Sequence, residues 1–152
     1  MFIEPIELET DLYEYQVEQI TEGNTSIVIA GITAGIEEAK SYFTSNNQKE
    51  FLDGRPRYDA EGIFSKSGNE RNPLILALTK DIAVWQILGL NNTDALYDRA
   101  EKRYEYAIKY FEKVQKGKVN ISNLPLIPDS TTTNNSEYEP YQMGSRKKFR
   151  HE

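Results

Sequence analysis

The segment Pro73–Gly89 constrains the fold most, because its apolar residues recur at helical spacing along its whole length. The stripe residues are separated by steps of 4, 4, 3 and 3 and are Leu74, Leu78, Ile82, Trp85 and Leu88. This spacing is typical of one buried face of an α-helix. Other apolar residues fill much of the remaining surface, which indicates the central helix of the fold. Asn72 is the expected N-cap, and Pro73 suits a first helical turn.

Two further segments carry the same kind of periodicity. The stripe of Ser26–Asn46 consists of Ile29, Ile32, Ile36, Ala39 and Phe43. A second stripe, in a helix expected to begin near Asn92–Asp94 and to end at Gly117, consists of Leu96, Ala100, Tyr104, Ala107, Phe111 and Val114. The β-branched run Ile27–Ile29 leaves a short strand open at the start of the first segment. Gly31 and Gly35 form a G-x-x-x-G pattern, which we interpret as close helix packing in water.

The remaining segments complete an all-α prediction. A short helix is expected over Thr10–Ile20, and Gln48–Asn72 is a long connection with sparse apolar residues. Residues 128–140 have too few apolar side chains to fold alone. We predict a bundle of about four helices with a long loop between its second and third helices. Residues 1–120 form the domain and residues 121–152 an extended arm, in which a strand over Val119–Leu126 stays open.

Composition excludes several classes of function. The 152-residue chain has no cysteine and one histidine, His151, so thiolate metal sites and cysteine nucleophiles are excluded and a Ser-His-Asp triad is not expected. No phosphate-binding glycine motif occurs. No apolar run approaches the roughly 18 residues of a membrane span, and the acidic start is unlike a secretory signal. We therefore expect no cofactor, no metal and no membrane partner.

The charge is distributed asymmetrically along the chain. Residues 1–22 hold seven acids and no lysine or arginine, whereas residues 141–152 hold four bases and one acid. Oppositely charged ends can pair head to tail between copies. Two independently solvated termini explain the charges equally well. Four tail cations would support only weak, sequence-blind DNA binding.

Several side chains are candidates for specific roles. Asp81 borders the buried stripe of its helix, and a buried charge needs a partner. We expect an ion pair with Arg103, or with Arg99, that fixes helix register. A catalytic acid at Asp81, or a carboxylate pair at Asp59 and Glu61, is the alternative. The ten tyrosines of the chain favour a protein interface.

The order of these features resembles the small helical phage head–tail connector family, also called head-completion or tail-adaptor proteins. Four passages carry the resemblance: Ile6–Leu12, Ile36–Phe43, Pro73–Ala83 and Arg103–Ile108. The second is similar to the family pattern A-x-x-x-I-x-x-Y-L. The fourth is similar to R-Y-x-x-A-x-x-x-L-x-x-x-x-x-G-x-x. The sequence departs from the family by a long loop before Pro73 and by the insertion ahead of Arg57-Tyr58.

The resemblance implies a non-catalytic virion protein in the phage neck, assembled in the bacterial host cytoplasm. It implies a ring of identical subunits, typically twelve, that contacts the portal protein and the next tail or neck protein, with DNA only as passing cargo. Expected contact residues in the arm are Tyr141, Arg146, Lys147, Lys148, Phe149 and Arg150. The loop Asp53–Phe64 is the second candidate contact, through Arg55, Arg57 and Tyr58. The alternative is a small regulatory module that binds one protein partner through its C-terminal arm.

Overall fold

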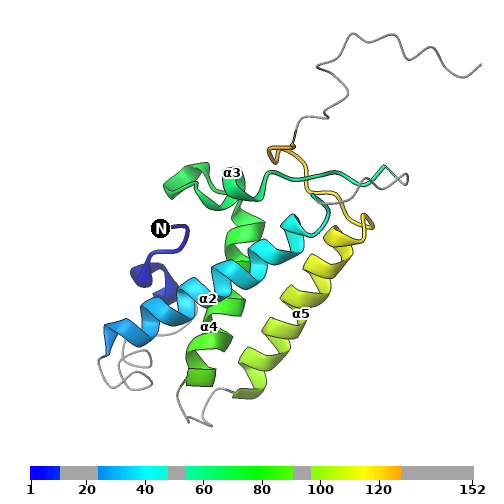
Figure 1. Cartoon of the computed structure of the whole chain (residues 1–152). Coiled ribbons are helices and arrows are strands. Elements are labelled where there is room, and N and C mark those ends of the chain that lie inside the picture. Colours follow the sequence, from blue (N-terminus) through cyan, green and yellow to red (C-terminus); the bar gives the residue numbers. More distant parts are fainter. Residues whose placement is uncertain (11–23, 48–53, 91–96, 128–152) are drawn as a thin grey trace, which may run out of the picture.

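The computed structural model describes residues 1–10, 24–47, 54–90 and 97–127. Three long helices form the body of the protein (Figure 1). The elements in chain order are η1 (Pro5–Thr10), α2 (Thr25–Thr44), α3 (Ala60–Phe64), η2 (Gly68–Glu70), α4 (Pro73–Leu90) and α5 (Tyr97–Gln115). The all-α prediction is confirmed. The helix expected over Thr10–Ile20 lies outside the described residues, apart from Thr10 at the end of η1.

The closest helix contact joins α2 to α4. A Cβ atom at Gly35 would lie 2.7 Å from the Cα of Ala83, and one at Gly31 would collide with Ile87. Both glycines are buried, and α2 packs more extensively against α4 than any other two elements pack together. The G-x-x-x-G pattern therefore brings two backbones together in water, as the sequence predicted.

The described residues of the three predicted stripes form much of the core, with two corrections, whereas Leu96 lies outside the described residues. Ile29 and Leu74 are exposed, at 42% and 40%, while their neighbours Val28 and Ile75 are buried. A helix turns about 100° per residue, so a stripe displaced by one position selects the adjacent side chain. Trp85 is half-buried, and the other residues expected in the centre of the core are buried: Leu78, Ile82, Ala107, Phe111 and Val114.

The predicted long loop contributes to the core. It contains α3 and η2, and its buried residues are Tyr58, Ala60, Ile63 and Phe64. The ring of Phe43 lies 5.6 Å from that of Tyr58, 5.7 Å from that of Phe64 and 5.5 Å from that of Phe111. Edge-to-face contacts at such distances add to the energy of apolar burial. Residues 54–72 are therefore part of the folded body.

The first residues of the chain also belong to the core, which the sequence analysis did not predict. Phe2, Ile3 and Leu8 are at most 3% exposed. The ring of Phe2 lies 4.9 Å from that of Phe64. The N-terminal segment therefore covers one side of the contact between α3 and the long helices.

Local capping explains where the long helices begin and end. Asn72 accepts hydrogen bonds from the backbone N–H groups of Leu74 and Ile75, as expected of an N-cap. At the end of α5, the N–H of Lys118 donates to the carbonyl of Lys113 at 2.8 Å. Gly117 has a φ of 69°, the left-handed conformation that closes a helix in this way.

By length and composition alone, α4 is long and apolar enough to cross a membrane, so the expectation that no segment approaches the length of a membrane span is corrected for this helix. Half of this helix is buried inside the protein, and it carries Lys80 and Asp81 near its middle. The core helix of a folded domain meets the same criterion, and α4 has that position here.

The α2–α4 contact predicts a strong difference between two glycines. Gly35→Ala forces a methyl group against the backbone of Ala83 and should destabilise the protein by about 1–3 kcal/mol. The matched control is Gly89→Ala, because nothing lies within 4 Å of the added atom. The control should be neutral or stabilise by up to about 1 kcal/mol. Urea unfolding measures both, and equal effects would contradict the close contact.

Candidate functional surface

The base of the C-terminal arm, residues 121–127, is paired with the segment before α3 at one end of the bundle. An isolated antiparallel bridge joins Tyr58 to Leu126. The N–H of Asp59 donates to the carbonyl of Pro125, and the N–H of Ile127 donates to that of Arg57, both at 2.9 Å. In Figure 1 the orange end of the described chain lies beside the stretch that leads into α3. The connection and the arm therefore meet in one short paired structure.

Tyr58 is placed inside the protein, so its expected role as a surface contact is corrected. The residue is 3% exposed, and its hydroxyl accepts a hydrogen bond from the N–H of Ile121 at 3.0 Å. Side chains alternate between the two faces of an extended segment. Arg57 and Asp59 are accordingly half-buried, while Tyr58 points into the core between them.

Arg55 and Arg57 remain partly accessible at this end. The Arg55 guanidinium donates to the carbonyl of Gln115 at 3.3 Å, and Asn46 donates to the same carbonyl at 2.8 Å. The last carbonyls of a helix lack partners within the helix. The Arg55 guanidinium therefore supplies a hydrogen-bond donor to a carbonyl group at the end of α5.

Residues 121–127 pack on the helical body, although the sequence analysis assigned them to the extended arm. Ile121 and Leu124 lie against the buried core, and Leu126 forms the bridge with Tyr58. The boundary expected at residue 120 is therefore too early. The expected contact residues of the tail lie outside the described residues: Tyr141, Arg146, Lys147, Lys148, Phe149 and Arg150.

Two polar contacts fasten α5 to the rest of the bundle. Arg103 forms the predicted ion pair with Asp81, at 2.6 Å, which links α5 to α4. Glu38 of α2 accepts hydrogen bonds from Tyr104 and Gln86, each at 2.7 Å. Burial, together with the bond to Glu38, raises the pKa of Tyr104 to about 12. These contacts fix the register of all three long helices.

The sequence analysis did not predict the hydrogen bonds of Glu38, because Glu37 and Glu38 are adjacent and such glutamates are usually solvated. Its signal is positional, since Glu38 lies three residues after Gly35 and so shares the side of α2 that faces α4. The Trp85 ring stacks on that of Tyr104 with centroids 5.3 Å apart. The polar contact is thus bordered by an aromatic one.

The carboxylate pair considered for hydrolysis has two separate structural partners. Asp59 caps α3 by accepting from the N–H of Gly62 at 3.0 Å. Glu61 forms an ion pair with Lys40 at 2.6 Å. Among the described residues, no group of three or more His, Cys, Asp or Glu side chains is placed to hold a metal ion.

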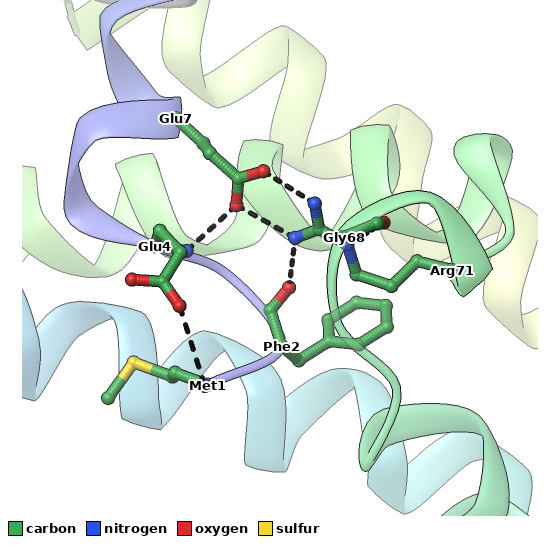
Figure 2. A network of polar contacts seen from close by, with 6 residues as sticks. All are labelled: Met1, Phe2, Glu4, Glu7, Gly68 and Arg71. Carbon is green, nitrogen blue, oxygen red and sulfur yellow. Dashed lines mark hydrogen bonds and ion pairs between the residues drawn. The ribbon is translucent and has the colours of Figure 1, made fainter.

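A third polar contact secures the N-terminal segment (Figure 2). Arg71, just before α4, makes two bonds to the Glu7 carboxylate at 2.7 and 2.5 Å, and a third to the carbonyl of Phe2 at 2.6 Å. The Arg71 side chain is 7% exposed. Its hydrogen bond to Glu7 is the main cause that lowers the pKa of this carboxyl from 4.5 to about 2.

In comparisons with known proteins, no protein family, curated protein or solved structure matches the chain.

The base of the arm should loosen when the Tyr58 hydroxyl is removed. Tyr58→Phe keeps the ring in place but leaves the Ile121 N–H without its acceptor, which should cost about 1 kcal/mol. Hydrogen exchange at residues 119–127 should accelerate more than exchange in α2. Tyr106→Phe is the control, because that side chain is exposed and should change neither rate. Unchanged exchange in the Tyr58 variant would contradict this role.

The Glu7–Arg71 contact predicts a pH-dependent stability. Because the folded pKa of Glu7 is lowered, its contribution is complete above about pH 4.5 and is lost as the pH falls toward 2. Glu7→Gln should destabilise the protein by about 2 kcal/mol at pH 7. Its difference from the unmodified chain should shrink below pH 4.5, as measured by urea unfolding across pH. Glu105→Gln, at an exposed ion pair, should show little of either effect.

Proposed function

We propose that the chain is a structural subunit of a bacteriophage neck, an adaptor that forms a ring between the portal and the tail. The proposal rests on the resemblance in sequence to the head–tail connector family, and the pairing of residues 125–127 with residues 57–59 is the structural observation that favours it. The portal protein, the next neck or tail protein and further copies of the chain are its proposed partners. DNA would pass through the ring without being a specific ligand.

The bridge at Tyr58 fixes the point from which an arm could reach a neighbour. Residues 128–152 are 25 residues long and follow directly after Ile127, whose N–H is bonded to Arg57. A chain of that length can span at most about 80–90 Å. A folded domain of this size is about 40 Å across. The arm is therefore long enough to cross one neighbouring subunit and contact the next component.

The rigidity of the body also supports an adaptor. Three helices are tied to one another through Glu38 and through the Asp81–Arg103 ion pair. Head-to-tail contacts between such bodies close into a ring when the rotation per subunit divides a full turn. A body of fixed shape keeps that rotation constant from one subunit to the next.

The test compares the full chain with a chain that ends at Ile127, which keeps the bridge and the helical body. Light scattering over a range of concentrations should give a discrete ring mass for the full chain and a smaller mass for the shortened one. Circular dichroism checks that both are folded. Replacing the four tail bases Arg146, Lys147, Lys148 and Arg150 by glutamine should weaken the ring without removing the arm.

Two results would contradict this proposal. A full chain that stays monomeric at its highest soluble concentration, both alone and with a portal ring, would remove the adaptor function. A tight dimer that shortening leaves unchanged would instead favour the regulatory module.

A further inference from the structure

The solvent side of α5 carries a row of four basic residues and one tyrosine at regular helical spacing. The row, called here the basic stripe, follows steps of 3, 4, 3 and 4 and consists of Arg99, Lys102, Tyr106, Lys109 and Lys113. All five residues are exposed, and Tyr106 is 60% exposed. This spacing places them on one face of the helix.

The basic stripe faces away from the bundle. The buried residues of α5 are Ala100, Ala107, Phe111 and Val114. With about 100° per residue, this apolar row lies roughly a third of a turn from the basic stripe. Figure 1 shows α5 at the edge of the bundle, with α2 and α4 on one side of it.

Three cations of the basic stripe lack a partner within the described part of the chain. Lys109 forms an ion pair with Glu105 at 2.7 Å. No ion pair or hydrogen bond engages the side chains of Arg99, Lys102 or Lys113 in the described ranges. A chain with a formal net charge of −6 thus presents a positive row around an exposed tyrosine.

The chain itself contains a segment of matching chemistry. Residues 11–22 hold four acids, Asp11, Glu14, Glu18 and Glu22, and no lysine or arginine. Their steps of 3, 4 and 4 residues are similar to the steps of 3, 4, 3 and 4 in the basic stripe. The nearby acid Glu7, in contrast, is already occupied by Arg71.

Nucleic acid fits the basic stripe less well than an acidic peptide does. A row of acids runs beside the stripe on α5 and contains Glu101, Glu105 and Glu112. A DNA duplex carries one negative charge per about 1.7 Å and is wide enough to meet both rows, so the acidic row would repel it. A single acidic peptide segment is narrow enough to contact the basic row alone.

We propose that the basic stripe of α5 docks the acidic segment 11–22 of a second copy of this chain. The contact uses different surfaces on the two copies, so it can be repeated from one subunit to the next. The inference rests on the self-association in the proposed function and adds a second contact between neighbouring copies, beside the one that the arm would make. Tyr106 supplies the apolar centre, and the cations on either side supply orientation.

The test mixes two full-length variants, each of which lacks one half of the contact. The base variant carries Lys102→Gln and Lys113→Gln. The acid variant carries Glu14→Gln and Glu18→Gln. Each variant alone should associate about tenfold more weakly than the unmodified chain. Their mixture should form a one-to-one complex, because the acid variant keeps its basic stripe and the base variant keeps its acidic segment.

The control for the base variant is Lys66→Gln with Lys118→Gln, which removes the same charge away from the stripe and should leave association unchanged. Added salt should weaken the mixed complex, since exposed charges are screened. Three results would overturn the inference: a monomeric unmodified chain at its highest soluble concentration, equal weakening by the control, or no complex in the mixture. A basic stripe filled by the acidic segment of its own chain would give the first of these results, an unmodified chain that stays monomeric.

The outcome is separable from that of the proposed function. The mixed complex needs neither a portal nor the arm beyond Ile127, so it can form even if no ring is found. A ring held together by the arm alone would persist in both variants, which would reject this surface and leave the adaptor function standing.

Discussion

The approach of α2 to α4 through Gly31 and Gly35 is the constraint on which the other contacts depend. With the backbone of α2 against Ala83, two helices share one narrow interface and leave their flanks for other elements. α5 packs on one flank, against both helices. A larger side chain at either glycine would separate the helices and with them every side chain that bridges the two.

Polar contacts then fix the register of the helices, which apolar burial alone does not determine. Apolar burial is non-directional, whereas an ion pair such as Asp81–Arg103 has one satisfactory register. Glu38 applies the same restriction to α2, α4 and α5 together. Arg71 does so for the N-terminal segment through Glu7. Hydrophobic burial thus supplies most of the attraction, and a few charged or hydrogen-bonded groups select one arrangement.

Helical periodicity was sufficient to predict the long helices, the Asn72 cap, the Gly117 stop and the Asp81–Arg103 pair. It failed where contacts join residues far apart in sequence. The core positions of Phe2, Ile3 and Leu8 have no periodic signal, and Tyr58 is buried through a single bridge to Leu126. The structural role of Glu38 was not predicted because it depends on a hydrogen bond from Tyr104, which lies 66 residues away. The proposed stripe on α5 is readable in the sequence, but its exposure became known only from the packing of the bundle.

The pairing at the base of the arm has a mechanical consequence. Tension applied to the chain beyond residue 127 would load the hydrogen bond from Ile127 to Arg57 before it reached α5. From Arg57 the load passes to Tyr58 and, through its ring, to Phe43 in the interior. The force would therefore enter the body at the aromatic cluster around Phe43, and the last turn of α5 would be shielded from unwinding.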